Sequence, residues 1–190
     1  MRVVFTRVPE GESTVRVFRN DGVVVDLPSY SRKHRIPHDL AHAVTERELR
    51  ISRGIFGSIA AGALFSNAKV VAGKLRHDSA ARSMRILKAH SGELGMAELL
   101  GGIMHLAVEH RMVPDAPAQV RRQWGAVSAE PCPFAEADLR RAAATLDRLG
   151  HEWGGIAVGG ELEFFWPDSL VPPVPPAEKS RVKARTMARR

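Results

Sequence analysis

Two histidines spaced four residues apart, His38 and His42, carry the clearest chemical signal in this sequence. They lie in the run PHDLAH at residues 37–42. On an α-helix this spacing places both imidazoles on one face, one turn apart. Two imidazoles in that arrangement can chelate one divalent ion, as they do in the His-Glu-x-x-His zinc motif. Asp39 stands where that motif has glutamate, and we interpret it as a candidate catalytic base for a metal-bound water, with a shorter reach.

A metal site needs at least one further protein ligand, and that ligand must come from another part of the chain. Glu46 lies on the same helical stripe, but it is about 12 Å from His38 along the axis, at a rise of about 1.5 Å per residue. His105 and Glu109 are themselves four residues apart in another predicted helix. We therefore predict one site for zinc or a similar divalent ion, with the ligands His38, His42, His105 and Glu109.

A structural role for the histidine pair remains the alternative, because two of the eight histidines in the chain can fall four apart by chance. Metal binding requires nitrogens of His38 and His42 within about 4 Å of each other, beside a cleft and a third ligand. A structural pair points into an apolar core or donates to a backbone carbonyl. His77-Asp78 is a further His-Asp dyad, but a helix cap at Asp78 explains it better than a phosphohydrolase site.

Hydrophobic periodicity predicts an α+β fold, with a small antiparallel sheet packed on four to five helices. Three Val-rich runs predict an N-terminal β-meander, at residues 2–8, 14–19 and 23–27. Asp21-Gly22 between two of them predicts a type I′ hairpin turn. Apolar alternation through residues 162–166 predicts a last strand, and its backbone groups need partners, so we expect it to rejoin the meander.

Helical spacing of apolar residues fills the middle of the chain. The run at residues 55–65 has almost no polar groups, which predicts a centrally buried helix. Gly150 predicts the end of the last helix. Five helices are predicted, at residues 38–51, 55–65, 78–90, 96–111 and 134–149, and residues 118–124 are a candidate for a further short helical segment.

The net charge of +7 is concentrated near the C-terminal end. Residues 177–190 carry six basic residues and one acidic residue, so they account for +5 of that charge. They follow a proline-rich segment. We predict a single domain over residues 1–166 and a Pro-rich, basic, disordered tail over residues 167–190. Such a tail can contact nucleic acid weakly and without sequence preference.

Three features of the sequence bear on its location. Cys132 is the only cysteine, which excludes an intrachain disulfide and a zinc site built on thiolates. The longest apolar run, residues 55–65, is shorter than the roughly 20 residues that span a bilayer. The first residues lack the apolar core of a secretory signal. We expect a cytoplasmic protein that does not associate with membranes.

Two segments of the chain are similar to a group of uncharacterised bacterial proteins: RIPHDLAH at residues 35–42, followed by Glu46, and GIFGSIAAG at residues 54–62. That group has a short β-rich start, a Pro-His-Asp-x-x-His helix and a Gly-x-x-Gly-x-x-Ala-x-Gly helix. The resemblance covers about residues 1–66. It implies a bacterial cytosolic protein of similar architecture and carries no known activity with it.

Two functions are consistent with these patterns. In the first, the histidine pair holds a divalent metal, and a bound water helped by Asp39 hydrolyses a small substrate. In the second, the protein is a non-catalytic binding module with structural histidines. Its basic tail then contacts a protein partner or nucleic acid.

Overall fold

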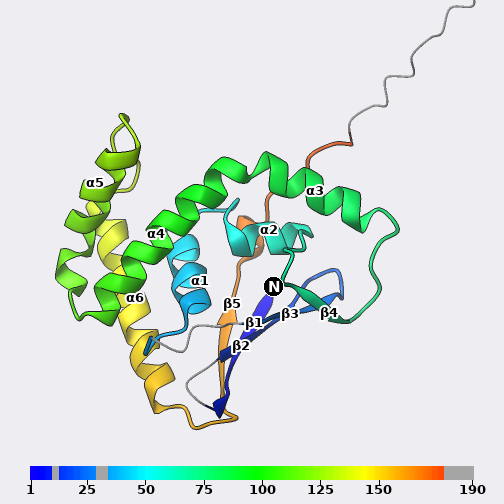
Figure 1. Cartoon of the computed structure of the whole chain (residues 1–190), viewed down its shortest axis with the longest axis horizontal. Helices are drawn as coiled ribbons and strands as arrows, with labels where there is room; N and C mark the ends of the chain where they lie inside the picture. Colours follow the sequence, from blue (N-terminus) through cyan, green and yellow to red (C-terminus); the bar gives the residue numbers. More distant parts are fainter. Residues whose placement is uncertain (10–12, 29–33, 178–190) are drawn as a thin grey trace, which may run out of the picture.

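The computed structural model describes residues 1–9, 13–28 and 34–177. Within them the chain forms a five-stranded antiparallel sheet and six α-helices, and the predicted α+β class is confirmed. The helices gather on one side of the sheet (Figure 1). The strands are β1 (Arg2–Arg7), β2 (Ser13–Phe18), β3 (Val24–Pro28), β4 (Lys69–Ala72) and β5 (Glu161–Phe165), in the order β4-β3-β2-β1-β5.

The last strand, β5, rejoins the meander by pairing with β1, as the sequence predicts. Arg2 lies opposite Phe165 in this pairing. Beyond it, the backbone nitrogen of Met1 donates to the carbonyl oxygen of Trp166 at 3.0 Å, and the nitrogen of Trp166 donates to the oxygen of Met1 at 2.9 Å. The first and last strands are therefore joined at one end of the sheet, where β5 is the edge strand.

The hairpin between β2 and β3 is present, but its turn is not type I′. A type I′ turn needs positive φ at both central residues, and of the pair Asp21-Gly22 only Gly22 has it, at 82°. Arg19 and Val23 close the loop, because the nitrogen of Arg19 donates to the oxygen of Val23 at 3.0 Å. The turn therefore has three residues, with glycine in the left-handed position.

Strand β4 is missing from the sequence-based prediction. It is four residues long and exposed throughout, so it has no pattern of alternating burial. It pairs with β3 at the sheet edge, with an irregular register between Val24 and Val25.

The described chain contains six helices, and three of their ends differ from the predicted ends by four or more residues. The second ends at Gly62, whose φ is 110°, rather than at Phe65. The fourth begins five residues before Met96. The sixth continues past Gly150. The bounds are α1 (His38–Glu48), α2 (Ile55–Ala61), α3 (Ser79–Ala89), α4 (Ser91–Glu109), α5 (Ala116–Val127) and α6 (Glu136–Gly155), with 3-10 turns η2 (Val113–Asp115) and η3 (Asp168–Leu170).

Gly150 has a packing role rather than a role in ending a helix. A Cβ at this position would lie 2.6 Å from Cδ1 of Ile36, which is fully buried. Glycine therefore lets the segment before α1 press against α6. The prediction of a helix end at Gly150 is wrong, because glycine also occurs within helices where another segment approaches closely.

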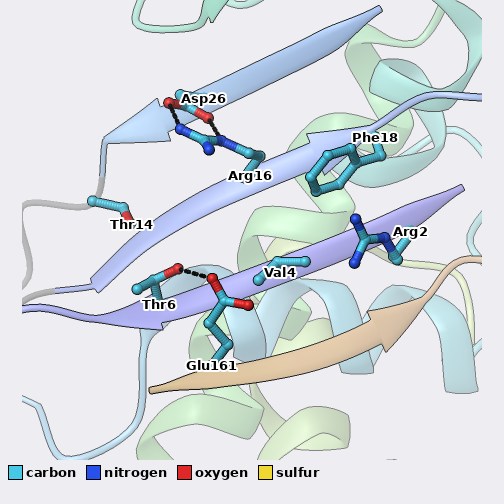
Figure 2. Close-up of a pocket in the computed structure, with 8 residues that line it drawn as sticks. All are labelled: Arg2, Val4, Thr6, Thr14, Arg16, Phe18, Asp26 and Glu161. Atoms are coloured by element: carbon cyan, nitrogen blue, oxygen red, sulfur yellow. Dashed lines mark hydrogen bonds and ion pairs between the residues drawn. The ribbon is translucent and has the colours of Figure 1, made fainter. Parts of the chain in front are cut away.

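The two faces of the sheet differ sharply in burial. The face toward the helices holds fully buried apolar side chains, including Val3, Phe5, Val15 and Val17. The opposite face is mostly polar, with Val4 and Phe18 among its side chains, and Figure 2 shows the hollow on it between Arg2 and Arg16. The core therefore lies between the sheet and the helices, where α1 is the central helix that contacts both α4 and α6.

The chain continues to pack beyond Trp166. Leu170 and Pro172 are buried, and Nε1 of Trp166 donates to the oxygen of Leu170 at 3.2 Å. The packed region thus extends past the predicted domain boundary, whereas residues 178–190 of the predicted tail lie outside the described residues. Among the described helices, none combines the length and the apolar character needed to cross a bilayer.

Candidate metal centre between helices α1 and α4

Helix α1 carries the predicted histidines into its contact with α4. Pro37 stands at the helix N-cap, so its missing N–H leaves no helical bond unmade. On the facing helix, Gly101 lies against His42, and a Cβ there would be 2.4 Å from Nδ1 of His42. The glycine therefore allows α4 to approach α1 at the turn that bears the histidines.

His38 and His42 are adjacent in space. Their Nε2 atoms lie 2.9 Å apart, and the rings meet edge to face with their centroids 4.5 Å apart. His42 is 1% exposed, while His38 is half-buried. The pair therefore presents two ring nitrogens at one point, at the separation that the sequence analysis required for a shared ion.

Glu98 on α4 is the third group at this point, and the sequence analysis missed it. Its Oε2 atom lies 3.6 Å from Nε2 of His42, and its side chain is 60% exposed. One ligand atom from each of His38, His42 and Glu98 lies within 4.8 Å of the others. A signal did exist, because Glu98 is seven residues before His105 and so shares its face of α4.

His105 contacts His38 but is not one of the three grouped ligands. Its Nε2 atom donates to the carbonyl oxygen of Ile36 at 2.9 Å, so its Nδ1 atom carries a lone pair. That Nδ1 atom lies 3.3 Å from Nδ1 of His38. Nδ1 of His38 must then carry the proton that joins them, which leaves the lone pair of His38 on Nε2, facing His42.

Glu109 does not reach the histidine pair. Its Oε1 atom accepts from the backbone nitrogen of Arg35 at 2.7 Å, and its Oε2 atom accepts from the nitrogen of Ile36 at 3.3 Å. It therefore fastens the segment before α1 to the end of α4. Together with His34 and His105 it forms a second group of possible ligands.

The two groups of possible ligands both depend on the lone pair of His105 Nδ1. His105 has a single free ring nitrogen, Nδ1, since Nε2 is bound to Ile36. If that nitrogen accepts from His38, it cannot also bind an ion beside His34 and Glu109. The four predicted ligands are thus divided between two places, and the group with His38, His42 and Glu98 is the one that an outer histidine supports.

Burial keeps the inner histidines neutral. Burial, together with the nearby charges of His38 and His105, lowers the pKa of His42 to about 3. Burial also lowers the pKa of His105 to about 4, although its bond to Ile36 acts in the opposite direction. Both rings are therefore unprotonated near neutral pH, which is the state that a metal ligand requires.

A pocket of about 230 Å³ lies beside the group. Glu98 and Asp39 line it, so Asp39, the candidate base, opens into the same space as the candidate ligand. The other lining side chains are one polar residue, Asn67, and an apolar set made of Leu27, Ile55, Phe65 and Leu94. The arrangement combines polar groups at one wall with an apolar chamber, as small-molecule sites commonly do.

Glu46 has a structural role. Its Oε1 and Oε2 atoms accept from the backbone nitrogens of Ile55 and Phe56 at 2.9 and 3.0 Å, so it caps the start of α2. It is fully buried, and a Cβ at Gly54 would lie 2.4 Å from its carboxyl carbon. This agrees with its exclusion as a ligand on grounds of distance.

Ser58 and His90 form a hydrogen-bonded pair outside this site. Oγ of Ser58 lies 2.9 Å from Nδ1 of His90. Both residues are at most 1% exposed, so substrate cannot reach the hydroxyl. The pair joins α2 to the junction of α3 and α4.

Comparisons with protein-family models, with curated proteins and with solved structures find no match for this chain. Function is therefore inferred from the geometry of these residues.

Proposed function

We propose that this protein is a divalent-metal-dependent hydrolase, with His38, His42 and Glu98 as ligands and Asp39 as base. The observation that carries the proposal is the 2.9 Å separation of the two Nε2 atoms, with a carboxylate oxygen 3.6 Å from one of them. Two histidines and one carboxylate, with a position left open for water, are the ligands of many hydrolytic zinc sites. This set replaces His105 and Glu109, which the sequence placed among the ligands.

The distances suit a shared ion. Two nitrogens bound to one zinc at about 2.0–2.1 Å stand about 2.9 Å apart at a right angle and about 3.3 Å apart at the tetrahedral angle. His38 and His42 already stand at the first of these values. Glu98 is exposed enough for a rotamer change to bring its carboxylate nearer.

The hydrogen bond from His38 to His105 supports the same assignment. Metal-bound histidines usually donate their second ring nitrogen to an acceptor, which fixes the tautomer and the ring orientation. His105 supplies that acceptor, and Ile36 fixes His105 in turn. Nδ1 of His42 has no partner among the described residues, so this ring is oriented by packing against Gly101 and by its contact with His38.

The chemistry assigned to the site is hydrolysis. A divalent ion held by His38, His42 and Glu98 would lower the pKa of a bound water. Asp39 would accept one proton from the attacking water and return it to the leaving group, as the water oxygen bonds to the electrophilic atom of the substrate and the bond to the leaving group breaks. The apolar pocket beside Asp39 and Glu98 holds the rest of the substrate.

The test measures zinc binding and turnover separately. Untagged, chelator-treated protein is titrated with zinc by calorimetry, and we expect one ion per chain. The double variant His38→Ala/His42→Ala should lose it. Glu98→Gln, a change at an exposed position that leaves the fold intact, should bind zinc more weakly, while Glu93→Gln on the same helix should not. Equal zinc affinity in the wild type, Glu98→Gln and the double variant would refute the proposal.

Turnover is then followed with ester, amide and phosphoester probes. Asp39→Asn should retain zinc and lose hydrolysis, because it changes the base and keeps the ligands. Hydrolysis that persists undiminished in both Asp39→Asn and Glu98→Gln arises elsewhere and contradicts the assignment.

The alternative function, a non-catalytic binding module, is favoured by one observation. His42, His38 and His105 can satisfy one another in a chain of hydrogen bonds that ends at the carbonyl of Ile36, with no ion needed. In that case the three histidines fasten α1 to α4. A protein that binds no zinc and is destabilised by the double variant would support this alternative.

A further inference from the structure

A basic pocket lies beyond the C-terminal end of α4, away from the histidine pair. Its volume is about 430 Å³. Arg35 enters it from the segment before α1, Arg111 from the turn after α4, and Asp147 and His151 from α6. Val113 in η2 completes the lining. Three separate segments of the chain therefore meet around this space.

In the described part of the chain, no carboxylate oxygen lies within 4.0 Å of a side-chain nitrogen of either arginine of this pocket. Arg35 makes one hydrogen bond to the backbone, from Nη2 to the oxygen of Val108 at 3.3 Å. Elsewhere arginines are commonly paired. Arg16, for example, is bound through two nitrogens to Asp26 on the open face of the sheet (Figure 2). The pocket thus contains guanidinium N–H groups that make few hydrogen bonds to the described residues.

Arg111 also occupies an unfavourable backbone position. Its φ is 58°, and it stands just after the helix, where the nitrogen of Met112 donates to the oxygen of Ala107 at 2.7 Å. Glycine is the residue that usually fills this place, because it has no Cβ to strain the left-handed conformation. An arginine here contributes nothing to the helix end that glycine would not provide with less strain.

Three groups oppose an anion in this pocket. Asp147 carries a carboxylate, and its backbone oxygen accepts from Nδ1 of His151 at 2.8 Å. Glu109 carries a second carboxylate, which accepts from the backbone nitrogen of Arg35 at 2.7 Å. The carbonyls at the end of α4 add a partial negative charge of about one half. The two guanidinium charges therefore do not exceed the opposing charge, and binding must come from direct N–H contacts, which favour an anion with several acceptor oxygens.

We propose that this pocket binds the phosphate group of a small molecule, held by Arg35 and Arg111. A phosphate dianion offers acceptors to both guanidiniums at once, and arginine matches phosphate geometry through paired N–H donors. The proposal is independent of the metal centre, which shares no side chain with this pocket.

The test titrates the full chain with inorganic phosphate and follows amide chemical shifts, with sodium chloride at equal ionic strength as the reference. Arg111→Gly removes the guanidinium and relieves the backbone strain, so we expect it to keep the fold. The matched control is Arg50→Gly, since Arg50 occupies the equivalent position after α1 with φ of 57°. A second variant, Arg35→Gln, tests the other donor.

We expect saturable phosphate binding in the wild type and in Arg50→Gly. Binding should be about tenfold weaker in Arg111→Gly and in Arg35→Gln, the loss expected for a charge-assisted hydrogen bond. A parallel titration with phenyl phosphate compares a phosphomonoester with free phosphate. The one that binds more tightly is the better match for the ligand of this pocket. Equal losses in Arg111→Gly and Arg50→Gly, or shifts that sodium chloride reproduces, would overturn the proposal.

Discussion

His42 and Glu98 meet across the contact between α1 and α4, with Nε2 of the buried histidine 3.6 Å from an oxygen of the exposed carboxylate. The histidine is fixed by packing, while the carboxylate reaches in from solvent. A site built in this way has one rigid wall and one adjustable ligand. Its affinity for zinc therefore depends on how closely α1 and α4 approach each other.

Gly101→Ala tests that approach directly. The added methyl group would lie 2.4 Å from Nδ1 of His42, so either the ring or the helix must move. We expect a loss of about 1–3 kcal/mol in the free energy of unfolding, as for overpacking in a core, together with weaker zinc binding. Urea denaturation and calorimetry measure the two effects.

The neighbouring glycine provides the control for this change. A Cβ at Gly102 meets nothing within 4 Å. Gly102→Ala should therefore stabilise the protein by about 0.5–1 kcal/mol, because alanine is the better helix former, and zinc affinity should not change. If Gly101→Ala behaves like Gly102→Ala, the helices do not pack as closely as described.

His105→Leu tests the role of His105 as the acceptor for His38. It replaces the imidazole with an apolar side chain of similar size and removes the lone pair to which His38 donates. We expect zinc affinity to fall by about 10–100-fold, as for other changes behind a metal ligand. His105→Gln, whose amide oxygen can accept the same proton, should recover part of the loss. His110→Ala, a change at an exposed histidine on the same helix end, should have no effect.

Glu46→Gln tests the buried carboxyl group that caps α2. Burial raises the pKa of Glu46 from 4.5 to about 8, although the nitrogens of Ile55 and Phe56 act in the opposite direction. The folded protein then binds this proton more tightly than the unfolded chain does. The resulting contribution to stability is fully present below pH 4.5 and is lost as the pH rises to about 8.

Urea denaturation across that pH interval measures the effect. The free energy of unfolding of the wild type should decrease relative to that of Glu46→Gln, by on the order of a few kcal/mol, as the pH rises. Because all other groups titrate in both proteins, the difference isolates Glu46. Parallel curves for the two proteins would show that this carboxyl group keeps an ordinary pKa in the fold.

Removal of residues 177–190 tests the basic tail, whose composition predicts weak contact with nucleic acid. The segment accounts for +5 of the net charge of +7. Deletion should lower the affinity for a DNA or RNA duplex and flatten its dependence on salt concentration. Fluorescence anisotropy at several salt concentrations measures both. A truncated protein that binds as the full chain does would place the nucleic-acid contact on the folded domain.

The sequence was sufficient for the main elements because their signals are local. Val-rich alternation marks β1 to β3, and the pattern at Leu162 and Phe164 marks β5. Strand β4 has no such signal, since all four of its residues are exposed and only its pairing with β3 defines it. The helix end predicted at Gly150 is wrong for a related reason. This glycine is required by the contact with Ile36, which is distant in sequence.

The candidate site likewise has a part that local sequence predicts and a part that depends on contacts between distant segments. The spacing of His38 and His42 places them on one helix face, and this is a property of α1 alone. The choice between Glu98 and Glu109 depends on how α4 is aligned along α1. These two carboxylates are eleven residues apart, about 16 Å at a rise of about 1.5 Å per residue. No periodicity within either helix fixes that alignment, and Gly101 sets it through a contact between them.

The pairing of β1 with β5 has a consequence for the order in which the chain can fold during synthesis. β1 and β2 are complete after about a tenth of the chain, but the other edge of β1 stays open until residues 161–165 leave the ribosome. Throughout that interval Val3 and Phe5 belong to an exposed edge that can pair with another nascent chain. A fragment ending before Glu161 should therefore aggregate, and β5 acts as the closing strand that ends this exposure.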